Sequence, residues 1–232
     1  MRQLNNERLL ESYVSKFNID SFFSIDMLPY MKLLEYSTNE TVLGRGSKLD
    51  YYYFHVKGTA QICAVLENGK SLLLRFSKPL TVLGDVETFT SRMILCDVIA
   101  VTECMFIGIS VGDIERYCYN DPVFLRASLI AASEKVKGLT RSAPINLLYP
   151  LKTRFLSYLI TVEFNEYKAE NINEIKTYKL KEIAMLLGSS YRHLNRIINE
   201  LVEEKVITRS KKKITIIDHQ KLRQMSAKDL YE

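Results

Sequence analysis

Residues 179–203 (KLKEIAMLLGSSYRHLNRIINELVE) hold two short apolar helical patterns separated by a tight turn, and they constrain the fold more than any other stretch. Leu180, Ile183 and Leu187 fall at a spacing that places them on one face of a helix. A second such set consists of Leu194, Ile197, Ile198 and Leu201. Gly188 can adopt a positive φ at the end of the first helix, and a serine after it can cap the second. The pattern predicts a helix-turn-helix, whose second helix enters the DNA major groove.

A basic turn between two β-branched segments follows this motif. Residues 206–208 and 214–217 flank the sequence RSKKK at residues 209–213, which predicts a hairpin with a cationic tip. Such a wing reaches backbone phosphates beside the major groove. The predicted DNA-binding residues are Ser190, Tyr191, Arg192, Asn195, Arg196, Arg209, Lys211, Lys212 and Lys213. The alternative is an ordinary helical hairpin within a protein core.

The charge distribution separates the two halves of the chain. The formal net charge is +5, and residues 150–232 hold 16 Lys and Arg against 11 Asp and Glu, which accounts for all of it. Residues 1–149 hold 16 of each sign and are neutral. A neutral front half and a basic back half suit a sensing or assembly domain joined to a nucleic-acid-binding domain.

The middle of the chain changes to short segments rich in Val, Tyr, Phe and Ile. The predicted strands cover residues 41–43, 51–56, 59–66, 71–76, 81–83, 98–102 and 104–109. Many short strands separated by turn residues indicate a barrel or a sandwich. We expect an antiparallel barrel of the jelly-roll kind, with short helices over residues 4–18 and 20–35, in a domain that spans residues 1–120.

A long helix is predicted after Asp121 and Pro122. Its apolar residues alternate at spacings of four and three, as at the a and d positions of a coiled coil, and they are Leu125, Leu129, Ala132, Val136 and Leu139. We expect this stripe to be a dimer seam; the alternative is that it packs against its own barrel. Pro144 and Pro150 predict a hinge, since proline biases its predecessor away from helix. The dimerisation helix and hinge would cover residues 121–146, and the DNA-binding domain residues 147–232.

Several classes of protein are disfavoured by the composition. The four cysteines form no CxxC pair and no signal peptide precedes them, which favours a reducing cytoplasm. We expect no membrane segment, because no apolar run approaches about 18 residues. A cupin-like barrel enzyme with an appended helical domain is the runner-up, but metal chemistry there needs clustered histidines and only His55 lies in the strand region. We therefore expect no enzyme and no metal site.

The order of a strand-rich barrel, a long heptad helix and a winged helix-turn-helix resembles the bacterial CRP/FNR family of transcription regulators. The resemblance covers nearly the whole chain and implies an α+β fold with a domain like those that bind cyclic nucleotides. In the family's helix-turn-helix, a small residue, a glycine, an apolar residue and a DNA-facing arginine recur at the spacing of Ala184, Gly188, Leu194 and Arg196. Tyr191 and Arg192 replace the arginine and glutamate that read bases in cyclic-AMP-responsive members.

The effector site departs further from the family pattern. Gly84 and Asp85 match the family's Gly-Glu, but Ile94 and Leu95 stand where its Arg-Ser pair should be. Arg92 lies nearby and is the candidate substitute, because a half-buried phosphate needs a cation. The ligand-binding candidates are Gly84, Asp85 and Arg92, and the effector is expected not to be cyclic AMP. Haem and iron–sulfur members use Cys or His near the N-terminus, where this chain has neither, so no cofactor is implied.

The sequence thus predicts a cytoplasmic, sequence-specific transcription regulator that binds a palindromic operator as a homodimer. Its expected partners are double-stranded DNA and a second copy of the chain, with RNA polymerase and an unidentified small molecule as further candidates. A barrel that binds nothing and only holds the dimer is the third alternative. A barrel lined by Tyr, Phe and Leu fits both a packed core and an apolar pocket.

Overall fold

The computed structural model describes residues 1–65, 67, 71–166, 174–176, 180–210 and 213–226. The chain divides into two compact units. The first holds Met1–Ile62 and Phe76–Gly138, and the second holds Cys63–Arg75 and Leu139–Glu232. The domain limits predicted at residues 120 and 146 stay predictions.

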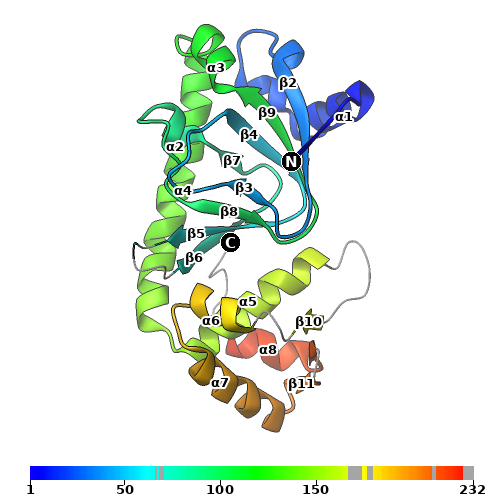
Figure 1. Cartoon of the computed structure of the whole chain (residues 1–232), viewed down its shortest axis with the longest axis vertical. Coiled ribbons are helices and arrows are strands. Elements are labelled where there is room, and N and C mark those ends of the chain that lie inside the picture. Colours follow the sequence, from blue (N-terminus) through cyan, green and yellow to red (C-terminus); the bar gives the residue numbers. More distant parts are fainter. Residues whose placement is uncertain (66, 68–70, 167–173, 177–179, 211–212, 227–232) are drawn as a thin grey trace. The chain divides into compact units, whose positions relative to one another are not determined.

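A five-stranded antiparallel sheet organises the first unit. Its strand order is β1 (Arg2–Leu4), β2 (Met31–Tyr36), β9 (Cys104–Ser110), β4 (Tyr51–Lys57) and β7 (Val82–Leu83). Strand β9 lies in the middle and pairs with both β2 and β4, so that Ile107 is opposite Leu33 on one side and Phe54 on the other. Figure 1 shows β2, β9 and β4 running side by side.

Both faces of this sheet are buried. Side chains alternate between the faces of a strand, and on β4 Tyr52 and Phe54 lie in a cluster with the surrounding helices, whereas Tyr53 lies in a second cluster with the other sheet. On β9, Ile107 lies in the cluster with the helices and Phe106 lies in the cluster with the other sheet. This two-sided burial explains why β4 and β9 read as continuous apolar runs rather than as alternating patterns.

The second sheet has four strands in the order β3 (Thr41–Leu43), β8 (Asp97–Ala100), β5 (Ala60–Val65) and β6 (Ser71–Ser77). Buried residues of β3, β5 and β8 share a core with the inner face of the first sheet. The predicted α+β class with an antiparallel jelly-roll-like domain is confirmed. The predicted barrel is not closed, because its strands belong to two separate sheets.

Helices cover the outer face of the five-stranded sheet. They are α1 (Glu7–Phe17), the 3-10 turns η1 (Ile19–Phe22) and η2 (Leu28–Tyr30), α3 (Val111–Tyr117) and the start of α4 (Pro122–Leu148). Short helix α2 (Asp85–Thr88) follows β7. Asp121 fixes the start of α4, since its Oδ1 accepts from the Val123 amide at 2.9 Å and its Oδ2 accepts from the Ser24 amide at 2.8 Å. Burial raises the pKa of Asp121, but these hydrogen bonds outweigh it and the net pKa is lowered.

Two expectations from the sequence were wrong. Residues 31–35 were expected to be helical but belong to β2, because pairing with β1 and β9 overrides the helical preference of Met and Leu. The long helix was expected to end near Pro144 but continues to Leu148. A proline inside a helix removes one hydrogen bond and does not always end the helix. The break falls at Pro150, whose carbonyl accepts from the Arg154 amide at 3.2 Å.

The second unit is mainly helical. It contains α5 (Leu151–Glu166), α6 (Leu180–Leu186), α7 (Tyr191–Glu203) and α8 (His219–Met225), together with a small sheet of order β10 (Glu174–Lys176), β12 (Lys213–Ile216) and β11 (Ile207–Arg209). Helix α5 contacts both α7 and α8. Among the described residues, no helix is long and apolar enough to cross a membrane.

His55 is a fully buried polar residue in the first unit. Its Nε2 donates to the Lys57 carbonyl at 2.7 Å, so the neutral ring accepts at Nδ1 from the Ser77 hydroxyl at 2.8 Å. The ring also stacks on Phe106 with centroids 4.4 Å apart. Burial lowers the pKa of His55 to about 4, because a charged imidazole would lose its hydration there.

We predict that His55 makes the first unit sensitive to acid. The unfolded chain gains a proton at this residue as the pH falls through about 6.5, whereas the folded chain does not until about pH 4, so stability is lost across this window. The loss should approach about 3 kcal/mol. Urea unfolding between pH 7 and pH 4, followed by circular dichroism, measures it.

The matched variant is His55→Gln, whose amide can donate to the Lys57 carbonyl but cannot be protonated in this range. The variant should show a shallower fall in unfolding free energy below pH 6.5, since all other titrating groups are shared. Parallel curves for the two proteins would contradict the prediction.

Candidate nucleic-acid interface

The turn between α6 and α7 is fixed by backbone hydrogen bonds and by one long-range contact. Gly188 has φ of 60°, and its amide donates to the Met185 carbonyl at 2.9 Å. The Ser189 amide donates to the Ala184 carbonyl at 2.8 Å. Arg154 of α5 donates from Nη1 to the Leu187 carbonyl at 2.5 Å, which satisfies another carbonyl at the end of α6. The helix-turn-helix is therefore held from within and by α5.

Helix α7 begins with a serine cap and has two distinct faces. The Ser190 Oγ accepts from the His193 amide at 3.2 Å, so this predicted DNA-binding residue has a structural role as the N-cap. The buried face consists of Leu194, Ile197, Ile198 and Leu201. The opposite face carries Tyr191, Arg192 and Arg196, which are exposed, and Asn195, which is half-buried. The sequence pattern placed all of these correctly because α7 is regular and strongly amphipathic.

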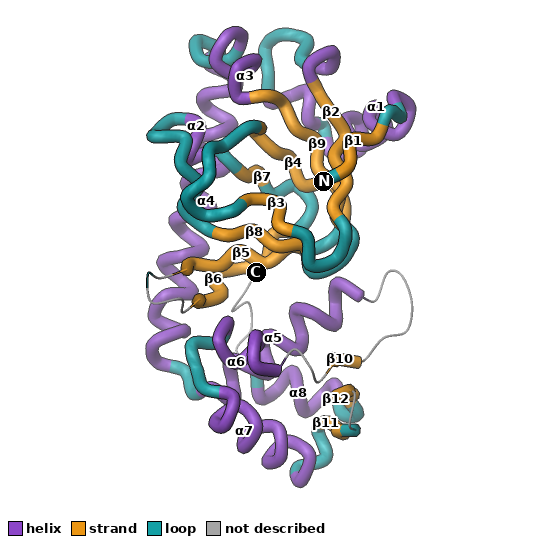
Figure 2. Tube along the Cα trace, in the orientation of Figure 1, coloured by secondary structure: helices purple, strands orange, loops and turns teal. Residues whose placement is uncertain are grey.

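Strand β11 follows α7 and contacts it, and it pairs with β12 as the predicted hairpin (Figure 2). Ile207, Ile214 and Ile216 are buried, whereas Arg209 and Lys213 are exposed. Strand β10 pairs with the other edge of β12, which the sequence did not indicate. Lys211 and Lys212 lie outside the described residues.

The hairpin and α7 are joined by a side-chain contact. Arg209 donates from Nη1 to the Asn195 Oδ1 at 2.6 Å, and the same nitrogen is 3.4 Å from the Asn199 Oδ1. Arg196 makes a looser ion pair with Glu200, with Nε and Oε1 3.8 Å apart. The structure thus brings Asn195 and Arg209 together. It also adds Asn199, which sequence reasoning missed because no local pattern connects it to the hairpin.

The apolar stripe of α4 is exposed. The exposed fractions are 38% at Leu125, 68% at Leu129, 63% at Val136 and 41% at Leu139, and Ala132 is half-buried. The residues that α4 turns toward the sheet are different ones: Phe124 is fully buried, and the Ser128 hydroxyl is 3.0 Å from the Tyr52 hydroxyl. The four large side chains of the stripe are therefore not buried against the barrel, and the dimer seam stays a prediction.

The three ligand-binding candidates, Gly84, Asp85 and Arg92, are each in close contact with another side chain of the protein. Gly84 has φ of 85°, and a Cβ there would lie 2.9 Å from the Leu49 side chain, so only glycine fits. Asp85 is buried and forms an ion pair with Lys135 of α4, as a buried carboxylate requires. Arg92 forms an ion pair with Glu115 of α3. Sequence spacing did not indicate Lys135 or Glu115, because both pairs join distant segments.

The position of the missing Arg-Ser pair is apolar in the structure as well. Ile94 is buried, whereas Leu95 is 57% exposed. The Leu95 amide donates weakly to the Glu87 Oε1 at 3.4 Å, so a carboxylate lies beside Leu95. Neither Ile94 nor Leu95 has a side chain that could supply a cation to an anionic ligand.

Two of the four cysteines lie in environments that suppress their reactivity. Cys63, Cys104 and Cys118 are buried and Cys96 is half-buried. Burial raises the pKa of Cys104 to about 11 and that of Cys118 to about 12, which leaves almost no thiolate at neutral pH. Among the described residues, no group of three or more His, Cys, Asp or Glu could hold a metal ion.

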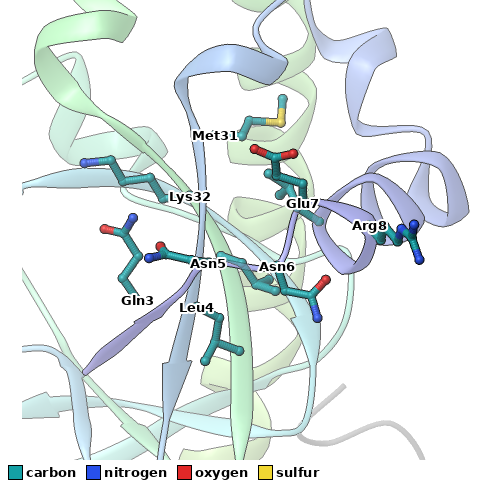
Figure 3. Close-up of a pocket in the computed structure, with 10 residues that line it drawn as sticks. Gln3, Leu4, Asn5, Asn6, Glu7, Arg8, Met31 and Lys32 are labelled. Carbon is teal, nitrogen blue, oxygen red and sulfur yellow. The ribbon is translucent and has the colours of Figure 1, made fainter.

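A surface pocket of about 470 Å³ lies beside β1, β2 and the start of α1 (Figure 3). Its lining includes two neutral amides, Gln3 and Asn5, the acidic Glu7, and the basic Arg8 and Lys32. None of the three ligand-binding candidates belongs to this lining. No local pattern of residues indicated this pocket, because its lining comes together only through the pairing of β1 with β2.

Two family models match this chain, and they match its two halves. The model described as a cyclic nucleotide-binding domain matches residues 33–121. The model described as a Crp-like helix-turn-helix domain matches residues 153–225, the segment that holds α6, α7 and the hairpin. The chain belongs to the CRP/FNR family. It is a transcription regulator with a helix-turn-helix domain.

Two curated relatives of this CRP/FNR regulator share about a fifth of its residues. Regulatory protein YeiL of Escherichia coli is 22% identical over 200 residues, which cover 86% of this chain and 88% of that protein. The global nitrogen regulator of a Nostoc strain is 21% identical over 185 residues, which cover 78% of this chain and 83% of that protein.

Solved structures share the fold at low sequence identity. A CRP/FNR-family structure from Eubacterium rectale has a TM-score of 0.73 at 15% identity and covers 96% of this chain and 94% of its own. A CRP/FNR-family regulator from Thermus thermophilus has a TM-score of 0.67 at 20% identity, with coverage of 83% and 97%. The fold, with two sheets, a long helix and a winged helix-turn-helix, is therefore shared with these structures.

Proposed function

We propose that this CRP/FNR regulator acts in the cytoplasm as a homodimer that binds a palindromic operator through α7 and the β11–β12 hairpin, without enzymatic activity. The observation that carries the proposal is the exposed cationic face of α7, with Arg192 and Arg196 opposite four buried apolar residues. Arginine can donate two hydrogen bonds to guanine N7 and O6. RNA polymerase is a further proposed partner, since transcription regulators of this kind act where polymerase binds.

The hairpin supports phosphate binding beside the groove. Lys213 is exposed at the start of β12, and Arg209 is exposed at the end of β11. Lysine acts on phosphates as a point charge, without reading sequence. We therefore propose two roles: α7 recognises bases, and the lysines of the hairpin increase the affinity for DNA of any sequence.

The exposed stripe of α4 supports the proposed dimer. Four large apolar side chains at a and d spacing would lie in water in a monomer, which is unusual for a contiguous set. A second copy of the same helix would bury them by coiled-coil packing. A two-fold dimer also holds two recognition helices one turn of DNA apart, as a palindromic operator requires.

We predict that base reading and phosphate binding respond differently to substitution. Arg196→Ala should lower affinity for the preferred duplex by about 1–3 kcal/mol and affinity for random duplexes by less. Lys213→Ala should weaken all duplexes alike and reduce the slope of log K against log salt by about one unit. Fluorescence anisotropy at several salt concentrations measures both, with the preferred duplex first selected by the wild-type protein from a random library.

The control for this experiment is Lys16→Ala, which removes an exposed lysine from α1 in the other unit and should change neither quantity. If Arg196→Ala and Lys213→Ala bind DNA like this control, the proposed DNA interface is wrong. If Arg196→Ala lowers the affinity for all duplexes equally, Arg196 contributes to DNA binding but does not recognise bases.

We predict that a charge in the α4 stripe gives monomers. Leu129→Glu or Val136→Glu would force an unpaired carboxylate into an apolar interface, which is strongly unfavourable. Sedimentation velocity should show a fall from dimer to monomer. The matched control is Ile130→Glu, an equally drastic change at a residue that is 56% exposed and one position off the stripe. A Leu129→Glu protein that still sediments as a dimer would rule this seam out.

We further propose that the effector, if the regulator has one, is not cyclic AMP. The carboxylate of Asp85 and the guanidinium of Arg92 already pair with Lys135 and Glu115. An anionic phosphate would have to separate one of these pairs to gain a cation.

Isothermal titration calorimetry should therefore give no saturable heat with micromolar cyclic AMP. Thermal melting against a panel of metabolites provides the comparison, since a ligand at about 100 times its Kd stabilises by about 2.7 kcal/mol. Saturable binding of cyclic AMP would refute this part of the proposal.

A further inference from the structure

Arg209 of the hairpin lies over the side of α7 that faces away from the protein core. Its Nη1 donates to the Asn195 Oδ1 at 2.6 Å and lies 3.4 Å from the Asn199 Oδ1. The two asparagines are four residues apart and therefore lie on the same face of α7, one turn apart. The contact joins the hairpin to the middle of the helix.

This contact determines how the Asn195 amide is oriented. An arginine side chain can only donate hydrogen bonds, so the atom of Asn195 that meets it must be the oxygen. The Nδ2 group then points away from Arg209, so this contact leaves its two donors for another partner. Without such a contact the terminal torsion of an asparagine is broad, and the amide would sample several orientations.

The orientation leaves Asn195 with the donor and acceptor pattern that an adenine edge matches. An asparagine recognises adenine by donating to N7 and accepting from the N6 amino group. A carbonyl oxygen has two lone pairs, so Oδ1 can accept from Arg209 and from a base at the same time. Asn195 lies one turn from Arg192 and is half-buried, at the side of the exposed face that is proposed to enter the groove.

We propose that Arg209 is a positioning residue for sequence recognition: it orients the Asn195 amide so that Asn195 reads an A·T pair in each half of the operator. The inference rests on the proposed DNA-binding function and assigns a specific role within it. Arg209 acts through Asn195 and need not contact the base itself.

The competing role for Arg209 is that of a hairpin cation that contacts only a phosphate. That role predicts weaker binding to every sequence and a smaller salt dependence, with the order of preferred bases unchanged. The positioning role predicts loss of preference at one base-pair position. Sequence preference therefore separates the two roles, and overall affinity does not.

The test uses full-length protein and a double-substitution cycle of Arg209→Ala, Asn195→Ala and the two combined. Binding preferences are measured by selection from a random duplex library and then by anisotropy on duplexes changed at single positions. The wild-type protein should prefer A·T at one position per half-site by about tenfold or more. Each single variant should lose most of this preference, and the double variant should lose no more than either alone.

Asn199→Ala serves as the matched control, since it removes an equivalent amide that makes only the longer contact. It should keep the preference at the position lost in the Asn195→Ala protein. All substituted residues are exposed or half-buried, and circular dichroism melting verifies that each variant is folded.

An Arg209→Ala protein that keeps every base preference, or losses that add in the double variant, would overturn the inference. The Arg196→Ala and Lys213→Ala proteins distinguish this result from failure of the proposed function. If these two variants weaken DNA binding while Arg209 and Asn195 act independently, only the positioning role is wrong. If neither variant affects DNA binding, the proposed interface itself is wrong.

Discussion

The first unit depends on a sheet that is buried on both faces. Strands β4 and β9 pair with each other along their length, and their alternate side chains enter two different cores. A side chain such as Phe54 or Phe106 buries enough apolar surface to contribute several kcal/mol when it is removed from water. The helices on one face and the second sheet on the other are held against this pair, so the start of α4 is placed by it as well.

The fold could be predicted from the sequence where the deciding interactions are local. The helix-turn-helix has a glycine at its turn, a serine that caps the second helix, and an apolar face on each of its two helices, all within 25 residues. The sequence pattern predicted each of these features, and the structure has them. Strand β2 could not be recognised, because Leu33 and Leu34 are both buried but enter different cores. Two-sided burial removes the alternation by which a strand is usually identified.

In the candidate site, too, local features could be predicted from the sequence and contacts between distant segments could not. Spacing placed Tyr191, Arg192, Asn195 and Arg196 on the polar face of α7, because helical geometry is regular, and their contact with DNA stays a prediction. It could not identify the ion pairs of Asp85 with Lys135 and of Arg92 with Glu115, since these join segments far apart in the chain. Nor could it place the guanidinium of Arg209 on α7. Side-chain partners across a tertiary contact depend on the folded backbone, which no local pattern encodes.

The pairing of β2 with β9 has a consequence for the order in which the chain can fold during synthesis. Met31 is opposite Ile109, so β2 gains this neighbour only after most of the first unit has left the ribosome. Until then a strand with apolar residues on both faces has an open edge, which favours association with other chains. Contacts between such distant segments also form slowly. Nascent chains of this regulator should therefore depend on chaperones, or on slow synthesis, more than its native stability would suggest.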